Sequence, residues 1–149
     1  MLPSALIVVR RRENRVKCTI QPLRGTPGLE FVNYPLRAQL DLSRHLLLAP
    51  DAPPLTRADA GWPLLLLDGS WRHAAQMRKA IGPVEARSIP SAWRTAYPRH
   101  SKILADPDAG LATVEALFAA YCILGHRDDS LLRLYAWREK FLELNRALL

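Results

Sequence analysis

The chain has 149 residues, of which 49% are apolar and 23% are charged, and its formal net charge is +7. These values are those of one globular domain, or of one core with a small lobe, and no stretch is long and apolar enough to cross a bilayer. The excess of positive charge favours a polyanionic partner, most simply nucleic acid, although a merely basic soluble protein would have the same balance.

The two cysteines, Cys18 and Cys122, lie far apart and form no CxxC pair. Their spacing gives neither a disulfide framework nor a zinc site, and it fits a reducing compartment. The apolar run over residues 5–9 ends in arginines and lacks the order of a secretory signal. We therefore expect a cytoplasmic protein without a membrane partner.

The first predicted element is a strand over residues 5–9, which are rich in β-branched side chains. A basic segment follows, with six cations in fifteen positions: Arg10, Arg11, Arg12, Arg15, Lys17 and Arg24. We interpret this segment as a phosphate-binding face, and a solvated basic loop is the alternative.

The next part of the chain reads as loops and short strands, with one strand expected around residues 29–32. Residues 45–49 predict a buried strand that ends at Pro50, where several prolines force a loop. Thr56 then predicts the start of a helical turn, with Asp59 completing a capping box.

The central stretch of the chain is a leucine run followed by a turn and a helix. Residues 64–67 are four leucines and predict a strand buried on both faces. Ser70 is a good N-cap for a helix over residues 71–80. This order places Asp68 and Trp71 at the carboxyl end of a strand, where open α/β sheets bind ligands. The alternative is that Asp68 only caps the helix and Trp71 belongs only to the core.

Gly82 ends that helix, and a short strand is expected at residues 86–89. The loop over residues 91–108 then interleaves cations with aromatic side chains: Trp93, Arg94, Tyr97, Arg99, His100 and Lys102. This mixture suits stacking on bases and contact with phosphates, and a surface loop with incidental charge is the alternative.

Residues 111–124 are nearly all apolar and predict a buried helix that Gly125 ends. The only charge in this run is Glu115. A buried carboxylate needs a partner, unless it faces solvent at the start of the helix, where the dipole favours it. A last helix is expected to begin at Asp129 or Ser130, with an apolar face that extends from Leu131 to Leu144.

Motifs of several common enzyme classes are absent. The sequence contains no GxGxxG, no P-loop, no HExxH and no GxSxG, so nucleotide binding or hydrolysis by those routes is unsupported. The four histidines are scattered, so we expect no metal site. The remaining candidates for a functional site are the carboxylate of Asp68, the hydroxyl of Ser70 and the indole of Trp71, at the end of one predicted strand.

The stretch Asp68-Gly-Ser-Trp71 resembles the signature of the DTW-domain superfamily, which is Asp, two variable residues and Trp. Further matches recur in the same order along nearly the whole chain, with a gap over residues 20–44. They resemble the branch of small-subunit rRNA aminocarboxypropyltransferases: Lys17-Cys18-Thr19, Leu48-Ala-Pro50, Leu55-Thr-Arg-Ala-Asp59, Leu111-Ala-Thr-Val-Glu115-Ala116-Leu117 and Phe141-Leu-Glu-Leu-Asn145. The N-terminal cysteines usual in the tRNA-modifying branch are absent, which makes tRNA the less expected substrate.

The resemblance implies an α/β fold, a SPOUT-like parallel sheet flanked by helices, with a C-terminal trefoil knot and a small N-terminal α/β lobe. The change from proline-rich loop to strand near residue 60 would divide the lobe, residues 1–60, from a cofactor-binding region, residues 61–149. The implied activity uses S-adenosyl-L-methionine (SAM). It transfers the 3-amino-3-carboxypropyl group to N3 of a uridine or modified pseudouridine in RNA, most simply small-subunit rRNA. The branch is expected to be monomeric.

The resemblance also implies roles for single residues. Asp68 is the expected catalytic residue, a proton acceptor close to the ribose of SAM, and Trp71 and Ala74 match the pocket of the S-methyl group. The other expected cofactor-binding residues are Thr19, Leu48, Pro50, Ser70, Leu111, Ala112 and Thr113. The expected RNA-binding residues are Arg10, Arg11, Arg12, Arg15, Lys17, Arg94, Arg99 and Lys102.

The chain departs from that branch at two places. Gly69 stands where the branch usually has Cys, and the stretch over residues 96–101 is longer than its counterpart and altered. Two other functions stay open: a SPOUT-type RNA methyltransferase that uses SAM, and a non-catalytic RNA-binding protein of ribosome assembly. Product mass separates the two enzymes, and failure to bind SAM would favour the third function.

Overall fold

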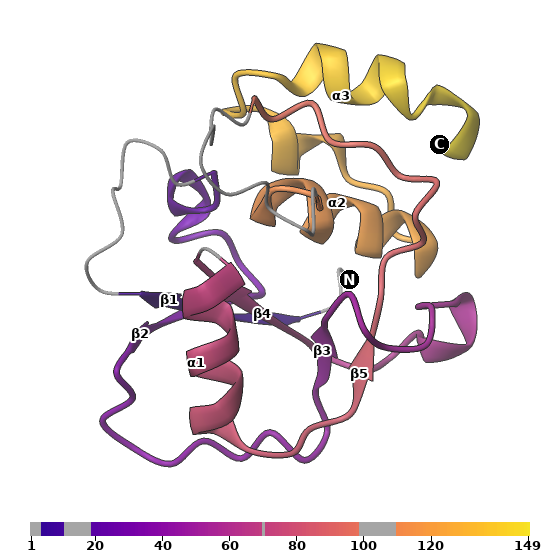
Figure 1. Cartoon of the computed structure of the whole chain (residues 1–149). Helices are drawn as coiled ribbons and strands as arrows, with labels where there is room; N and C mark the ends of the chain where they lie inside the picture. Colours follow the sequence, from indigo (N-terminus) through magenta and orange to yellow (C-terminus); the bar gives the residue numbers. More distant parts are fainter. Residues whose placement is uncertain (1–3, 11–18, 70, 99–109) are drawn as a thin grey trace.

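The computed structural model describes residues 4–10, 19–69, 71–98 and 110–149 (Figure 1). Within these ranges, five parallel strands form one sheet in the order β2-β1-β4-β3-β5. The strands are β1 (Ala5–Arg10), β2 (Leu29–Tyr34), β3 (Leu46–Leu48), β4 (Leu64–Asp68) and β5 (Ala86–Arg87). The parallel sheet expected from the sequence is confirmed, and β5 is shorter than the strand predicted at 86–89.

The register of the sheet brings the carboxyl ends of its inner strands together. β1 pairs with β4 so that Ala5 lies opposite Leu64 and Val9 lies opposite Asp68. β1 therefore ends beside Asp68, the predicted catalytic residue. The same pairing joins the strands on either side of residue 60, and the domain boundary proposed there stays a prediction.

Side chains of the inner strands alternate between the two faces of the sheet, as the strand pleat requires. On one face, Ile7 and Leu66 pack into a cluster with Phe118 of α2 (Thr113–Ile123). On the other face, Val8 packs into a cluster with Met77 of α1 (Trp71–Ile81). Figure 1 shows α1 on one side of the sheet and α2 on the other. Burial on both faces explains why the strands are almost continuously apolar.

The helices predicted over residues 71–80 and 111–124 are confirmed as α1 and α2, and the hydrogen bonds at the end of α2 explain where it stops. The N–H of His126 donates to the carbonyl of Tyr121 at 2.8 Å, and the N–H of Gly125 donates to that of Cys122 at 3.1 Å. This hydrogen-bond pair is a Schellman motif, which needs a left-handed residue after the helix. Gly125 supplies that conformation, with φ of +89°.

Short 3-10 turns connect the longer elements. Residues Gln21–Leu23 form η1 and Arg57–Asp59 form η2. The helical turn predicted from Thr56 is confirmed as η2, since the Asp59 carboxylate accepts a hydrogen bond from the Thr56 N–H at 3.0 Å.

The prediction of one long C-terminal helix was wrong. The structure has a 3-10 turn η3 (Asp129–Leu132), then α3 (Arg138–Leu144) and a final turn η4 (Arg146–Leu148). A tertiary contact accounts for the break: the Tyr135 hydroxyl, between η3 and α3, donates to the buried Glu115 carboxylate at 3.0 Å. Local helix propensity yields to such contacts.

Other expectations concern parts of the chain that the structure leaves out. Residues 99–109, which precede α2, lie outside the described residues, so the C-terminal knot and the N-terminal lobe stay predictions. In the described ranges, no helix has the length and apolarity needed to cross a membrane.

Candidate functional site

Asp68 is the last residue of β4, and its side chain points to the face of the sheet that α2 covers. The carboxylate is only 7% exposed, and its Oδ1 accepts a hydrogen bond from the Thr113 hydroxyl at 2.6 Å. Thr113 is the first residue of α2, so this carboxylate lies beside the positive end of a helix dipole. Asp68 therefore has a long-range partner and is not only a local cap of α1.

Thr19 meets the first turn of α2 as well. Its hydroxyl oxygen accepts a hydrogen bond from the N–H of Val114 at 3.2 Å. The structure thus brings together Thr19, Asp68 and Thr113, which are far apart in the sequence and which the resemblance assigned to one cofactor site. We call these three residues the threonine–aspartate cluster.

Two of the apolar residues expected to bind the cofactor, Leu48 and Leu111, lie on the face of the sheet that α2 covers. Leu48, at the end of β3, and Leu111, just before α2, are both half-buried and pack against the core cluster that contains α2. Pro50, two residues beyond Leu48, is exposed. These positions form one edge beside the threonine–aspartate cluster, because β3 pairs with β4 in parallel register.

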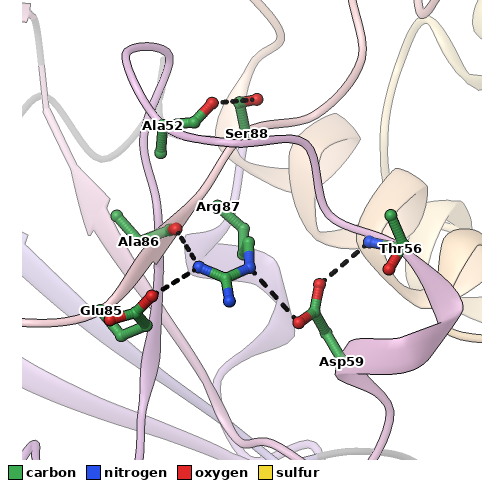
Figure 2. Close-up of polar contacts among 7 residues, drawn as sticks. All are labelled: Ala52, Thr56, Asp59, Glu85, Ala86, Arg87 and Ser88. Carbon is green, nitrogen blue, oxygen red and sulfur yellow. Dashed lines mark hydrogen bonds and ion pairs between the residues drawn. The ribbon is translucent and has the colours of Figure 1, made fainter.

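The loop that carries Pro50 is fastened to the chain beyond β5. The Ser88 hydroxyl donates to the carbonyl of Ala52 at 2.8 Å (Figure 2). The Ser88 N–H donates to the carbonyl of Pro53 at 2.8 Å. On its other side, the Asp51 carboxylate forms an ion pair of 2.7 Å with Arg78 of α1. The loop is therefore held from two elements.

Arg87 holds the turn η2 next to that loop. Its Nη1 donates to Glu85 at 2.8 Å and to the carbonyl of Ala86 at 2.7 Å, and its Nε lies 3.3 Å from Asp59 (Figure 2). The hydrogen bond to Glu85, together with the Asp59 charge, raises the pKa of Arg87 above its ordinary value. Sequence reasoning missed Arg87 and Ser88, since nothing local marks their distant partners.

No protein-family model matches the chain, and no curated protein matches it. Among solved structures, the chain is similar to a protein of Vulcanisaeta distributa described as the SAM-dependent rRNA:acp-transferase Tsr3. The two are 25% identical with a TM-score of 0.76, and the match covers 99% of this chain and 80% of the other. The chain has the fold of Tsr3. This likeness confirms the resemblance that the sequence motifs indicated.

Ala112, another expected cofactor residue, immediately precedes α2 and is half-buried. The other three expected cofactor residues, Ser70, Trp71 and Ala74, belong to α1 or immediately precede it in the sequence. Trp71 is the first residue of that helix, as predicted, while Ser70 and the Trp71 side chain lie outside the described part of the structure. Ala74, one turn into α1, is half-buried. The helix covers the opposite face of the sheet from α2, and its first residue follows closely after Asp68. A ligand at this edge would therefore lie between the starts of two helices.

Two of the expected RNA-binding residues are described. Arg10 ends β1 and is half-buried, with its Nη1 2.5 Å from Nε2 of His73 on α1. Arg94 is exposed, and its backbone N–H donates to the Asn145 side chain at 2.8 Å. The other expected RNA-binding residues lie outside the described residues: Arg11, Arg12, Arg15, Lys17, Arg99 and Lys102. A continuous basic face stays a prediction.

The described residues also show what Glu115 does in the apolar run. It is fully buried and accepts hydrogen bonds, so the expectation that it could face solvent was wrong. Asn145 is also a buried polar side chain. It lies in one of the stretches that resemble the family, but the sequence predicted no hydrogen-bond partner for it. Within the described ranges, His, Cys, Asp and Glu side chains form no group of three or more suited to a metal ion.

Proposed function

We propose that this chain transfers the 3-amino-3-carboxypropyl group of SAM to a uridine-type base in RNA. The observation that carries the proposal is the Asp68–Thr113 hydrogen bond at the carboxyl edge of the sheet, in a chain that shares its fold with an rRNA acp-transferase. An edge of this kind is where open parallel sheets bind their ligands.

The residues at this edge fit the chemistry of SAM. Backbone N–H groups at a helix N-terminus bind carboxylates, which suits those of Leu111 and Thr113 for the methionine carboxylate. The N–H of Ala112 between them donates to Glu115 instead. A carboxylate accepts about four hydrogen bonds, so pairing with Thr113 leaves Asp68 able to bind ribose hydroxyls, with Thr19 beside it. Leu48 and Pro50 offer apolar surface to the adenine.

The position of the sulfonium decides which of its carbons reacts. When bound, SAM supplies an alkyl carbon that a nucleophile attacks in line from about 3–3.5 Å. Trp71 and Ala74, at the start of α1, would enclose the S-methyl group and leave the aminocarboxypropyl carbon facing the RNA. An indole beside a sulfonium contributes roughly 0.5–2 kcal/mol of cation–π attraction.

Asp68 would act as the base. The N3 proton of uracil is weakly acidic, so a carboxylate that accepts it helps the attack, an effect of roughly 10²–10⁴ in rate. In this transfer N3 would bond to the propyl carbon as the carbon–sulfur bond breaks with its electron pair going to sulfur, and Asp68 would take the N3 proton. The Thr113 hydroxyl fixes the orientation of the carboxylate through its hydrogen bond.

The RNA would present its target base in a single-stranded loop, because a stacked and paired base cannot reach such a site. We infer that the substrate is rRNA, most simply of the small ribosomal subunit, with uridine or a modified pseudouridine as acceptor. The basic residues named above would bind its backbone, with Arg10 and Arg94 among them. The enzyme would act in the cytoplasm as a monomer.

Nucleoside mass spectrometry tests the proposal. Total RNA from cells that lack this gene is incubated with the protein and SAM, and the masses of its nucleosides are then measured. A nucleoside heavier by one aminocarboxypropyl group, absent with the Asp68→Ala variant, is the expected result. A methyl increment would instead assign a SPOUT-type methyltransferase. No increment, together with no SAM binding in calorimetry, would assign a non-catalytic RNA-binding protein.

A further inference from the structure

Glu115 is a fully buried carboxylate in the first turn of α2, and the proposed reaction assigns it no role. Four donors surround it. Oε1 accepts hydrogen bonds from the Thr95 hydroxyl at 2.6 Å and the Ala112 N–H at 2.7 Å. Oε2 accepts from the Ala96 N–H at 2.9 Å and the Tyr135 hydroxyl at 3.0 Å. Glu115 thus joins three separate segments of the chain.

The contact with Ala112 reaches the candidate site. Ala112 immediately precedes Thr113, whose hydroxyl binds Asp68. A carboxylate that holds the Ala112 N–H fixes the direction in which the chain enters α2, and with it the position of the Thr113 hydroxyl. The same carboxylate holds Thr95 and Ala96, so residues 93–97 are tied to the same turn.

We propose that Glu115 is a positioning residue that couples the start of α2, where SAM would bind, to the segment over residues 93–97. That segment contains Arg94 and leads toward the loop expected to meet RNA. The inference rests on the proposed function for its ligand, while its structural part stands on the four hydrogen bonds alone. Through this coupling, the cofactor end and the RNA end of the site keep one mutual geometry.

Asn145 provides a matched comparison, because it holds the same segment without reaching α2. Its side chain is 1% exposed; Oδ1 accepts from the Arg94 N–H at 2.8 Å, and Nδ2 donates to the carbonyls of Arg94 at 2.9 Å and Phe141 at 2.8 Å. Glu115 and Asn145 are thus both buried, polar and bonded to the segment over residues 93–97. Only Glu115 also binds Ala112.

The substitution Glu115→Gln replaces one of the two accepting oxygens by an NH₂ group, which is a donor. In the parent chain each Glu115 oxygen accepts from one hydroxyl and one backbone N–H. A hydroxyl can rotate and become an acceptor, whereas a backbone N–H cannot. An amide NH₂ in either place faces a backbone donor. The variant therefore loses the hydrogen bond to Ala112 or the one to Ala96, while its size and burial stay the same.

The experiment compares Glu115→Gln with Asn145→Ala and the parent chain. Amide hydrogen exchange followed by NMR reports on Ala96 and Ala112, and calorimetry reports on SAM affinity. We expect faster exchange of the Ala112 or Ala96 amide in Glu115→Gln and a SAM Kd raised about tenfold, the loss of one charge-assisted hydrogen bond. In Asn145→Ala we expect faster exchange at Arg94, with the SAM Kd close to that of the parent.

Two outcomes would overturn the coupling. Unchanged exchange at both alanines in Glu115→Gln would do so whether or not the parent binds SAM. Equal losses of SAM affinity in the two variants would show a structural role only. A parent chain that fails to bind SAM would remove the proposed function and the ligand part of this inference, and the exchange data would still decide the structural part. Should Glu115→Gln fail to fold, Thr95→Val removes one donor to Oε1 and is expected to shift exchange and Kd in the same direction by less.

Discussion

At the scale of single residues, the Asp68 side chain faces α2 and binds its first residue, in addition to preceding the turn into α1. Pleating alone predicts this, because Asp68 has the same parity in β4 as Leu64 and Leu66, which face α2. The partner, Thr113, could be placed in the site only through the family resemblance. A hydroxyl 45 residues away has no local signature.

Replacing Asp68 by Asn keeps the size and lets the amide oxygen accept from Thr113, so the fold is retained and SAM still binds. The amide cannot take a proton from N3, so we expect the transfer rate to fall by roughly 10²–10⁴. Single-turnover assays with mass detection measure the rate, and thermal unfolding checks the fold. Thr113→Ser, which keeps the hydroxyl, serves as the control. Turnover of Asp68→Asn at the parent rate would refute the assignment of Asp68 as base.

The proposed S-methyl pocket predicts an asymmetry between the two ligands of the enzyme. Trp71→Ala should weaken SAM binding more than RNA binding, because the indole would contact the sulfonium. Trp62→Ala is the matched control: Trp62 is 39% exposed and precedes β4, at the opposite edge of the sheet from Asp68. Calorimetry with SAM and filter binding with RNA measure both affinities. Equal losses for the two ligands in Trp71→Ala would point to a structural tryptophan.

At the scale of elements, the parallel strands followed from composition, since leucine and β-branched runs between prolines have few other structures open to them. The broken C-terminal helix did not follow, because the break depends on Tyr135 reaching Glu115. The loop after β3 could be predicted as a loop from Pro50 onward. Its fastening to Ser88 could not, because that hydrogen bond joins residues 36 apart.

The end of α2 allows a test of a single contact with two glycines. Gly82 and Gly125 both follow helices with positive φ, +78° and +89°. A Cβ on Gly82 would meet nothing within 4 Å, whereas a Cβ on Gly125 would lie 2.9 Å from Cζ of Arg57. Each Gly→Ala substitution should destabilise by about 1 kcal/mol through backbone strain. Gly125→Ala should lower the free energy of unfolding further, because the Arg57 side chain must also move.

Urea unfolding of the two variants measures both free energies. A larger loss in Gly125→Ala that disappears when Arg57 is also replaced by Ala would confirm the contact as the cause. Equal losses in the two single variants would show that the Arg57 side chain moves aside without consequence.

At the scale of the whole molecule, the core on the α2 side contains groups that resist ionisation. Burial raises the pKa of Tyr121 from 10.0 to about 12 and that of the Cys122 thiol from 9.0 to about 11. In the unfolded chain these groups lose their protons at the ordinary values, so above pH 9 the folded state holds more protons than the unfolded state.

The contribution of these two groups to the free energy of unfolding should therefore be complete below pH 9 and should fall as the pH rises from 9 to about 12, by about 3 kcal/mol for each group. Denaturant unfolding at a series of alkaline pH values measures this slope. Cys122→Ala should flatten its first part, between pH 9 and 11, and leave the later part. A parent chain whose stability does not change over this range would show that Tyr121 and Cys122 ionise as freely as in the unfolded chain.

β4 lies between β1 and β3 in the sheet, although both of those strands precede it in the chain. During synthesis, β1 and β3 therefore remain without their shared neighbour until residue 68 has left the ribosome. Thr113 follows Asp68 only after a further 45 residues, and Tyr135 follows Glu115 after another 20. The nascent chain can thus pair β1, β3 and β4 well before the contacts of the candidate site can form. We therefore expect no activity until the segments that carry Thr113 and Tyr135 have been synthesised.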